Sequence, residues 1–204
     1  MIYINGRLIV YLAIIGYLLI RGILIGRKYK KQIRVEWVKE VLRFLSVIYI
    51  SMVVSVTLFP IALGFNDESI YFSRTLNLVP LASIIKDFNQ IGTAYDGDII
   101  FMISLIVRNV GGNILLLMPL GFLAPFLWNK AKSLKGITIL GLVFSVTIEL
   151  LQLLETLAGG WGRITDIDDV ICNVLGVAIG FLVYIVFMRA GEKLKINMIR
   201  DLNT

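Results

Sequence analysis

Three carboxylates stand at the beginning of the last long apolar segment of the chain, and they are well suited to chemistry. They are Asp166, Asp168 and Asp169. On a helix, Asp166, Asp169 and Asn173 fall on one face, because they are spaced at i, i+3 and i+7. A polar face on a helix that is otherwise soluble in lipid indicates either a packing partner or a function.

Other polar side chains could act together with these carboxylates. Glu149, Asp166 and Asp169 are the candidate catalytic groups, as general acid and base or as ligands of a divalent cation. Arg108 and Arg163 could hold a phosphate or a carboxylate, and the amides could orient it. The residues predicted to bind a substrate are Asn77, Arg108, Asn109, Asn113, Gln152, Arg163 and Asn173.

The composition restricts the chemistry further. The chain contains no histidine and a single cysteine, Cys172. Histidine general-base catalysis, histidine-bound zinc and a disulfide framework are therefore excluded. The sequence carries no nucleophile elbow, no P-loop and no metal-ligand spacing, so it predicts no metal site and indicates no particular cofactor.

A purely structural interpretation of the same residues stays open. Thr165-x-x-Asp168 has the spacing of a capping box, and carboxylates in a first helical turn are favoured by the helix dipole. Glu149 and Gln152 could form hydrogen bonds between helices. The Gly176-x-x-x-Gly180 pair is typical of closely packed membrane helices.

The apolar content indicates which elements position these groups. Of 204 residues, 58% are hydrophobic, and the mean hydropathy is +0.86. We expect an all-α, polytopic transmembrane helix bundle with about five spans, since a span needs about 20 apolar residues. The predicted spans are 8–25, 41–65, 108–128, 134–157 and 168–188. A short interfacial or re-entrant helix is expected around 77–85, with Asn77 near its cap and Pro80 in its first turn, and another interfacial helix over 99–107.

The basic residues predict the orientation of the bundle. The segments 27–39, 129–135 and the tail after Met188 hold six, three and four Lys or Arg. These segments should be cytoplasmic, which puts the N-terminus outside and the C-terminus inside. Arg21, near the end of the first span, is expected to extend to the interface. The net charge of +6 is explained by these loops, so no nucleic-acid partner is expected. The candidate site residues then lie together at the outer side of the membrane.

Five motifs in order resemble the VanZ-like family. They are Thr57-Leu-Phe-Pro60, Asn77-Leu-Val-Pro80, the Asn109 to Phe122 segment, Glu149-Leu-Leu-Gln152, and the Arg163 to Gly180 segment. The resemblance covers about 45–188. It divides the chain into an N-terminal helix with a basic loop (1–44), a VanZ-like membrane domain (45–188) and a basic cytoplasmic tail (189–204).

The resemblance implies a plasma-membrane protein of the cell envelope and resistance to teicoplanin, a lipid-tailed glycopeptide antibiotic. Three functions stay open at this point. The protein could be an outward-facing enzyme acting on a lipid-linked envelope substrate through paired carboxylates and Arg. It could be a binder of membrane lipid, a lipid-linked envelope precursor or a lipopeptide. It could also be a bundle subunit whose polar stripe holds helices together and docks a partner.

Overall fold

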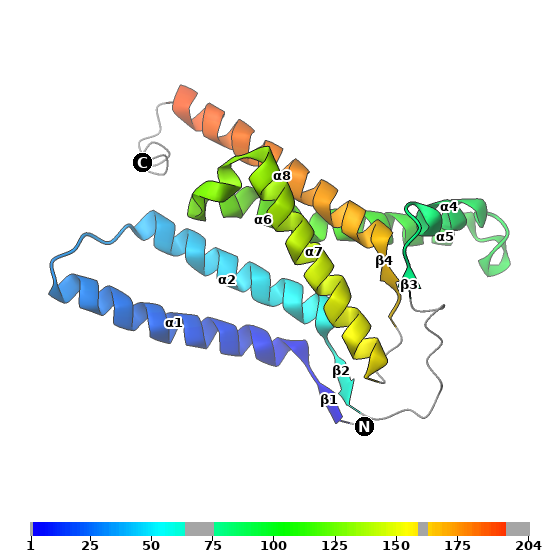
Figure 1. Ribbon diagram of the computed structural model, residues 1–204, viewed down its shortest axis with the longest axis horizontal. Coiled ribbons are helices and arrows are strands. Elements are labelled where there is room, and N and C mark those ends of the chain that lie inside the picture. Colours follow the sequence, from blue (N-terminus) through cyan, green and yellow to red (C-terminus); the bar gives the residue numbers. More distant parts are fainter. Residues whose placement is uncertain (1, 64–75, 159–162, 195–204) are drawn as a thin grey trace.

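The computed structural model describes residues 2–63, 76–158 and 163–194, and over these residues the protein is an all-α bundle (Figure 1). Five helices in the described ranges are long and apolar enough to cross a membrane. This confirms the predicted fold class. The spanning helices are α1 (Gly6–Lys30), α2 (Trp37–Leu58), the continuous helix Ile99–Leu127, α7 (Leu134–Leu157) and α8 (Ile167–Lys193).

The third span differs from the prediction. The chain was expected to break near Arg108, between an interfacial helix and a span. Instead, it stays helical from α5 (Ile99–Ile106) through a π-helical segment, η2 (Val107–Gly111), into α6 (Gly112–Leu127). The expected break is thus a local widening of the helix, of a kind that is frequent at functional sites.

The strands of the described residues form two pairs at one end of the bundle. Strand β1 (Ile2–Ile4) pairs antiparallel with β2 (Ile61–Leu63), and β3 (Leu76–Asn77) pairs parallel with β4 (Thr165–Asp166). The remaining short helices are α4 (Ala82–Asn89), η1 (Tyr95–Gly97) and η3 (Asn129–Lys132).

Two boundaries predicted near these elements were wrong. The second span ends at Leu58 rather than at residue 65, because Ile61 to Leu63 join the strand β2. The short helix α4 begins at Ala82, so Pro80 precedes it and Asn77 belongs to β3. The predicted end of the second span at residue 65 lies outside the described residues, as do the rest of 64–75, residues 159–162 and the tail from 195.

The core is formed mainly by α6 and α8, which cross at small residues. A Cβ atom on Gly176 would overlap the carbonyl oxygen of Ile114, and one on Gly180 would overlap that of Met118. The backbones can approach this closely only because these positions are glycine. Leu117 and Val177 are completely buried at the same contact. The close-packing interpretation of the two glycines is confirmed.

Helix α1 packs against α2 through an ion-pair network. Arg21 Nε donates to Glu40 Oε2 over 2.9 Å, and a second guanidinium nitrogen contacts Glu40 Oε1. Arg43 Nη1 donates to the same Oε1 over 2.6 Å. Arg21 is thus paired with a carboxylate of the neighbouring helix, and its extension to the interface stays a prediction.

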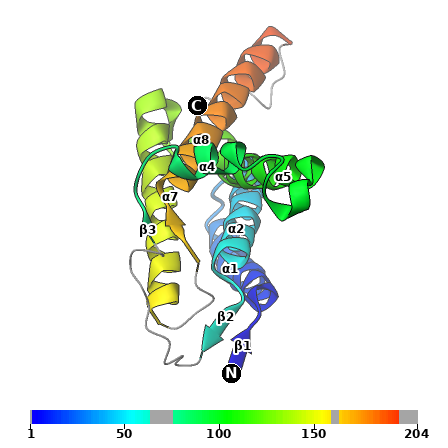
Figure 2. The ribbon, with the colours of Figure 1, turned by 90° about the vertical axis from the view of Figure 1, so that its right-hand side faces the viewer.

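The two ends of the bundle differ in charge. Figure 1 shows the 31–36 loop, η3 and the C-terminal end of α8 at one end. The strands and α4 lie at the opposite end, where α4 and α5 sit beside the beginning of α8 (Figure 2). The basic segments of the sequence are thus separated from the polar motifs by the length of the bundle.

Candidate polar site at one end of the bundle

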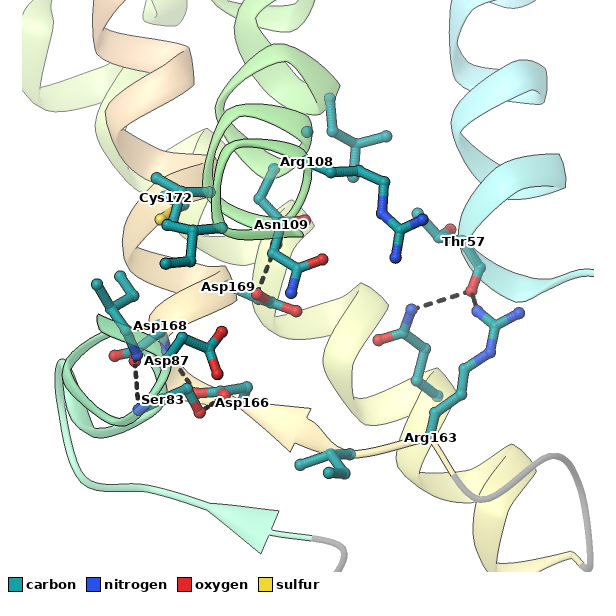
Figure 3. A pocket seen from close by; sticks show the side chains of 18 of the residues that line it. Thr57, Ser83, Asp87, Arg108, Asn109, Arg163, Asp166, Asp168, Asp169 and Cys172 are labelled. Atoms are coloured by element: carbon teal, nitrogen blue, oxygen red, sulfur yellow. Dashed lines mark hydrogen bonds between the residues drawn. The ribbon is translucent and has the colours of Figure 1, made fainter. Parts of the chain in front are cut away.

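A cavity of about 590 Å³ opens at the end of the bundle that carries the strands. Its walls come from α2, α4, the end of α5, η2, α6, α7, the segment 163–166 and the beginning of α8 (Figure 3). Its polar and charged lining residues are Thr57, Ser83, Lys86, Asp87, Arg108, Asn109, Asn113, Gln152, Arg163, Asp166, Asp168 and Asp169. Apolar residues, among them Val56, Ile106 and Leu116, complete the wall.

The cavity brings together most of the residues singled out in the sequence. Those that line it are Arg108, Asn109, Asn113, Gln152, Arg163, Asp166 and Asp169. Asn77, Glu149 and Asn173 do not line it. These three lie behind the wall and contact residues that hold it in place, as described next.

Asp168 holds the beginning of α4. It is 2% exposed. Its Oδ1 accepts a hydrogen bond from Leu81 N at 2.5 Å, and its Oδ2 accepts from Ser83 N at 3.1 Å and Ile84 N at 3.3 Å. The first turn of a helix has unpaired N–H groups, and here a carboxylate from α8 satisfies them. Asp168 was not among the predicted site residues, because a capping box with Thr165 explained it. Its actual partners are more than 80 positions away in the sequence.

Asp166 is the N-cap of α8, so the expected Thr165–Asp168 capping box does not form. Asp166 Oδ1 accepts from Asp168 N at 2.9 Å and from Asn77 Nδ2 at 3.0 Å. Its Oδ2 accepts from the Ser83 hydroxyl. Thr165 Oγ1 instead donates to the carbonyl oxygen of Glu149 at 3.4 Å. Asp166 therefore ties α4, β3 and α8 together.

Glu149 and Asn173 are buried contacts between α7 and α8. Glu149 is 5% exposed, and its Oε2 accepts from Asp166 N at 3.1 Å. Asn173 is 1% exposed, and its Nδ2 donates to Ser145 Oγ at 2.9 Å. Both side chains face the helix contact rather than the cavity.

Arg163 and Gln152 hold the end of α2. Gln152 Nε2 donates to the carbonyl oxygen of Thr57 at 3.0 Å, and Arg163 also donates to this oxygen. Arg163 Nη2 donates to the carbonyl oxygen of Phe59 at 3.4 Å, and its Nε lies 3.8 Å from Glu155 Oε2. Glu155 was not among the predicted site residues, although it continues the i, i+3 spacing of Glu149 and Gln152 on α7.

The remaining polar groups of the cavity have few protein partners. Asn113 Nδ2 donates to Asp169 Oδ1 at 2.5 Å, which leaves the second oxygen of Asp169 without a hydrogen bond from the described residues. Within the described ranges, the side chains of Arg108, Asn109, Lys86 and Asp87 make no hydrogen bond and no ion pair. In the same ranges, the acidic and cysteine side chains form no group of three or more that could hold a metal ion.

The comparison with known proteins agrees with the motifs. No curated protein and no solved structure matches the chain. The family model described as VanZ/LLP1 matches residues 45–188, which is more than half of the chain. All the lining residues, from Val56 to Cys172, lie inside this region. The predicted family is therefore confirmed, and the chain belongs to the VanZ/LLP1 family of multi-pass membrane proteins.

Proposed function

We propose that this protein binds the head group of a lipid or lipid-anchored molecule of the cell envelope in its polar cavity. Binding takes place on the outer side of the plasma membrane and lowers the susceptibility of the cell to teicoplanin. The observation that carries the proposal is Arg108, a cation in a membrane helix that faces the cavity without a protein partner among the described residues. Charged groups inside membranes mark binding sites or pathways by default.

The outward orientation follows from the positive-inside rule. The 31–36 loop, η3 and the end of α8 lie at the end of the bundle opposite the cavity (Figure 1). Lys and Arg are concentrated in and around these segments. Since such segments stay in the cytoplasm, the cavity opens to the outside.

Binding is favoured over catalysis by the arrangement of the carboxylates. The catalytic alternative, an enzyme acting on a lipid-linked envelope substrate, uses Glu149 and Asp169 as acid and base. A general base must come within hydrogen-bond reach of the proton that it takes. Glu149 is buried behind the wall with its Oε2 on Asp166 N, and Asp166 caps α8. Of the three candidates, Asp169 alone faces the cavity without a capping role.

The structural alternative accounts for only part of the cavity. Hydrogen bonds of Asp166, Asp168 and Arg163 connect α2, α4 and α8. A structural role therefore explains these three residues, and no ligand is needed to account for them. Arg108 and Asn109 hold no element in place, so packing alone does not explain them.

The test is a teicoplanin susceptibility assay on cells that express the full chain or a variant, with membrane abundance measured in the same cultures. Arg108→Gln and Asp169→Asn should return the susceptibility to that of cells with an empty vector, at wild-type abundance. Arg27→Gln removes an exposed cation at the opposite end and should keep full protection. Full protection by Arg108→Gln at normal abundance would contradict the proposal.

A further inference from the structure

The arginines and the carboxylates that line the cavity occupy different sides of it. In Figure 3, Asp87, Asp166, Asp168 and Asp169 lie on the side of α4 and the beginning of α8. Arg108 and Arg163 extend into the other side, toward Thr57. Lys86, on α4, is a lining cation next to Asp87 in the sequence. A cavity with charges separated in this way favours a ligand that carries both charges.

On the acidic side, two of the four carboxylates are already satisfied. Asp168 accepts three backbone N–H groups of α4, and Asp166 accepts from Asn77, Ser83 and the Asp168 backbone. Asp169 accepts one hydrogen bond, from Asn113, and Asp87 accepts none from the described residues. An ionised carboxylate has about four acceptor positions, so both can accept further donors.

On the basic side, one of the two arginines is already satisfied. Arg163 donates to the carbonyl oxygens of Thr57 and Phe59 and lies near Glu155. Arg108 has no such partner in the described part of the chain. A guanidinium group forms paired hydrogen bonds to a phosphate, and the neighbouring Asn109 amide can donate another.

We propose that the ligand of the cavity is a zwitterionic phospholipid with a primary amine in its head group. Its phosphate lies at Arg108 and Asn109, and its ammonium group lies against Asp169 and Asp87. This rests on the proposed function, since it names the class of ligand for the same cavity. Val56, Ile106 and Leu116 supply the apolar wall that the glycerol and the first part of the acyl chains need. Pockets of this volume bind small ligands.

The head group distinguishes this lipid from its common alternatives. A primary ammonium has three N–H donors for the carboxylates, whereas a choline ammonium has none. A glycerol head group has hydroxyl donors but no positive charge, and charge-assisted hydrogen bonds are about twice as strong as neutral ones. We therefore expect phosphatidylethanolamine to bind more tightly than phosphatidylglycerol or phosphatidylcholine with the same acyl chains.

The experiment measures lipid bound to the purified, detergent-solubilised full chain by native mass spectrometry. The three lipids are offered in equal amounts, and water-soluble glycerophosphoethanolamine is a separate sample. Wild type should retain phosphatidylethanolamine about tenfold over the other two, the ratio expected for about 1.4 kcal/mol. The soluble head group should bind much more weakly, because it lacks acyl chains. Equal binding of the soluble compound would contradict a lipid ligand.

Variants distinguish the two charged sides. Asp169→Asn keeps an oxygen that can accept from Asn113, so the wall should stay intact. This variant should lower the retained amount of phosphatidylethanolamine to that of phosphatidylglycerol. The retained amount of phosphatidylglycerol should not change. Asp87→Asn, on the short helix α4, should act in the same direction. Arg108→Gln should weaken the binding of both lipids, because both carry the phosphate.

The outcomes separate this inference from the proposed function. If wild type retains equal amounts of phosphatidylglycerol and phosphatidylethanolamine, and Arg108→Gln lowers the retention of both, the zwitterionic ligand is wrong. The lipid-binding function would still stand. If none of the variants changes the retention of any lipid, the cavity is not the binding site and both proposals fail.

Discussion

Two arginines in membrane helices have opposite surroundings in this molecule. Arg21 of α1 is held by Glu40 of α2, which also accepts from Arg43. Arg108, in the π-helical segment, faces a cavity and has no partner within the described ranges. The arginine that connects two helices has its hydrogen-bond acceptor on the neighbouring helix. We propose that Arg108 is left free for a ligand.

The strongest test of the structural arginine removes its carboxylate. Glu40→Ala leaves Arg21 and Arg43 without an acceptor, and breaking a buried pair in this way costs about 3–5 kcal/mol. We expect the free energy of unfolding, measured by thermal denaturation in detergent, to fall by an amount in this range. Glu36→Ala is the matched control, since Glu36 is exposed and its pair with Lys39 is worth under about 1 kcal/mol. Equal losses of unfolding free energy in Glu40→Ala and Glu36→Ala would mean that the Arg21–Glu40 pair contributes no more than an exposed ion pair.

A second structural test concerns Asp168. Asp168→Ala leaves three N–H groups of α4 without their acceptor, and each lost bond to a charged group is worth about 1–3 kcal/mol. Because water replaces part of this loss at the end of the bundle, we expect about 3 kcal/mol and a lower membrane abundance. Asp98→Ala removes a carboxylate that caps α5 through Phe101 N alone, and should cost about 1 kcal/mol. Wild-type abundance of Asp168→Ala would contradict the capping role.

The glycine contact between α6 and α8 is expected to give a smaller effect. Gly180→Ala puts a methyl group onto the carbonyl oxygen of Met118, and the helices must separate to admit it. Overpacking of this kind costs about 1–3 kcal/mol. Gly22→Ala is the control, because nothing lies within 4 Å of its new Cβ, and it should be neutral or slightly stabilising. The melting temperatures of the two variants in detergent measure the difference.

Arg108→Gln should change stability least. Since its side chain has no protein partner in the described part of the chain, we expect a change within about 0.5 kcal/mol, as for ordinary surface substitutions. In the same thermal assay, the stability loss of Arg108→Gln should therefore be much smaller than that of Glu40→Ala. A loss of 2 kcal/mol or more would mean that Arg108 is structural and that the comparison with Arg21 is wrong.

The sequence was sufficient to predict the spans and the shared location of the polar groups. Long apolar segments predict helices, and basic segments predict which helix ends lie together. The sequence was not sufficient to predict which polar group contacts which. Asp168 was assigned to its own helix, whereas its partners lie at Leu81 to Ile84, across the β3–β4 pair. Local spacing carries no information about such long-range contacts.

The same limit applies to the division of the site into supporting and free residues. Arg108 and Arg163 are equivalent by composition and charge. The structure separates them because the last turn of α2 ends beside Arg163 and offers it carbonyl oxygens. Which of the two arginines remains free depends on where a distant helix ends, and the sequence placed that end at residue 65 rather than at Leu58.

The Arg108 side of the cavity should be open to the outside of the cell. This prediction is tested most directly by labelling Asn109→Cys in intact cells with a membrane-impermeant maleimide, in a Cys172→Ala background that removes the native cysteine. Asn109→Cys should be labelled in intact cells, and Arg27→Cys in the same background only after the membrane is permeabilised. Labelling of Arg27→Cys but not Asn109→Cys in intact cells would contradict the outward orientation of the cavity.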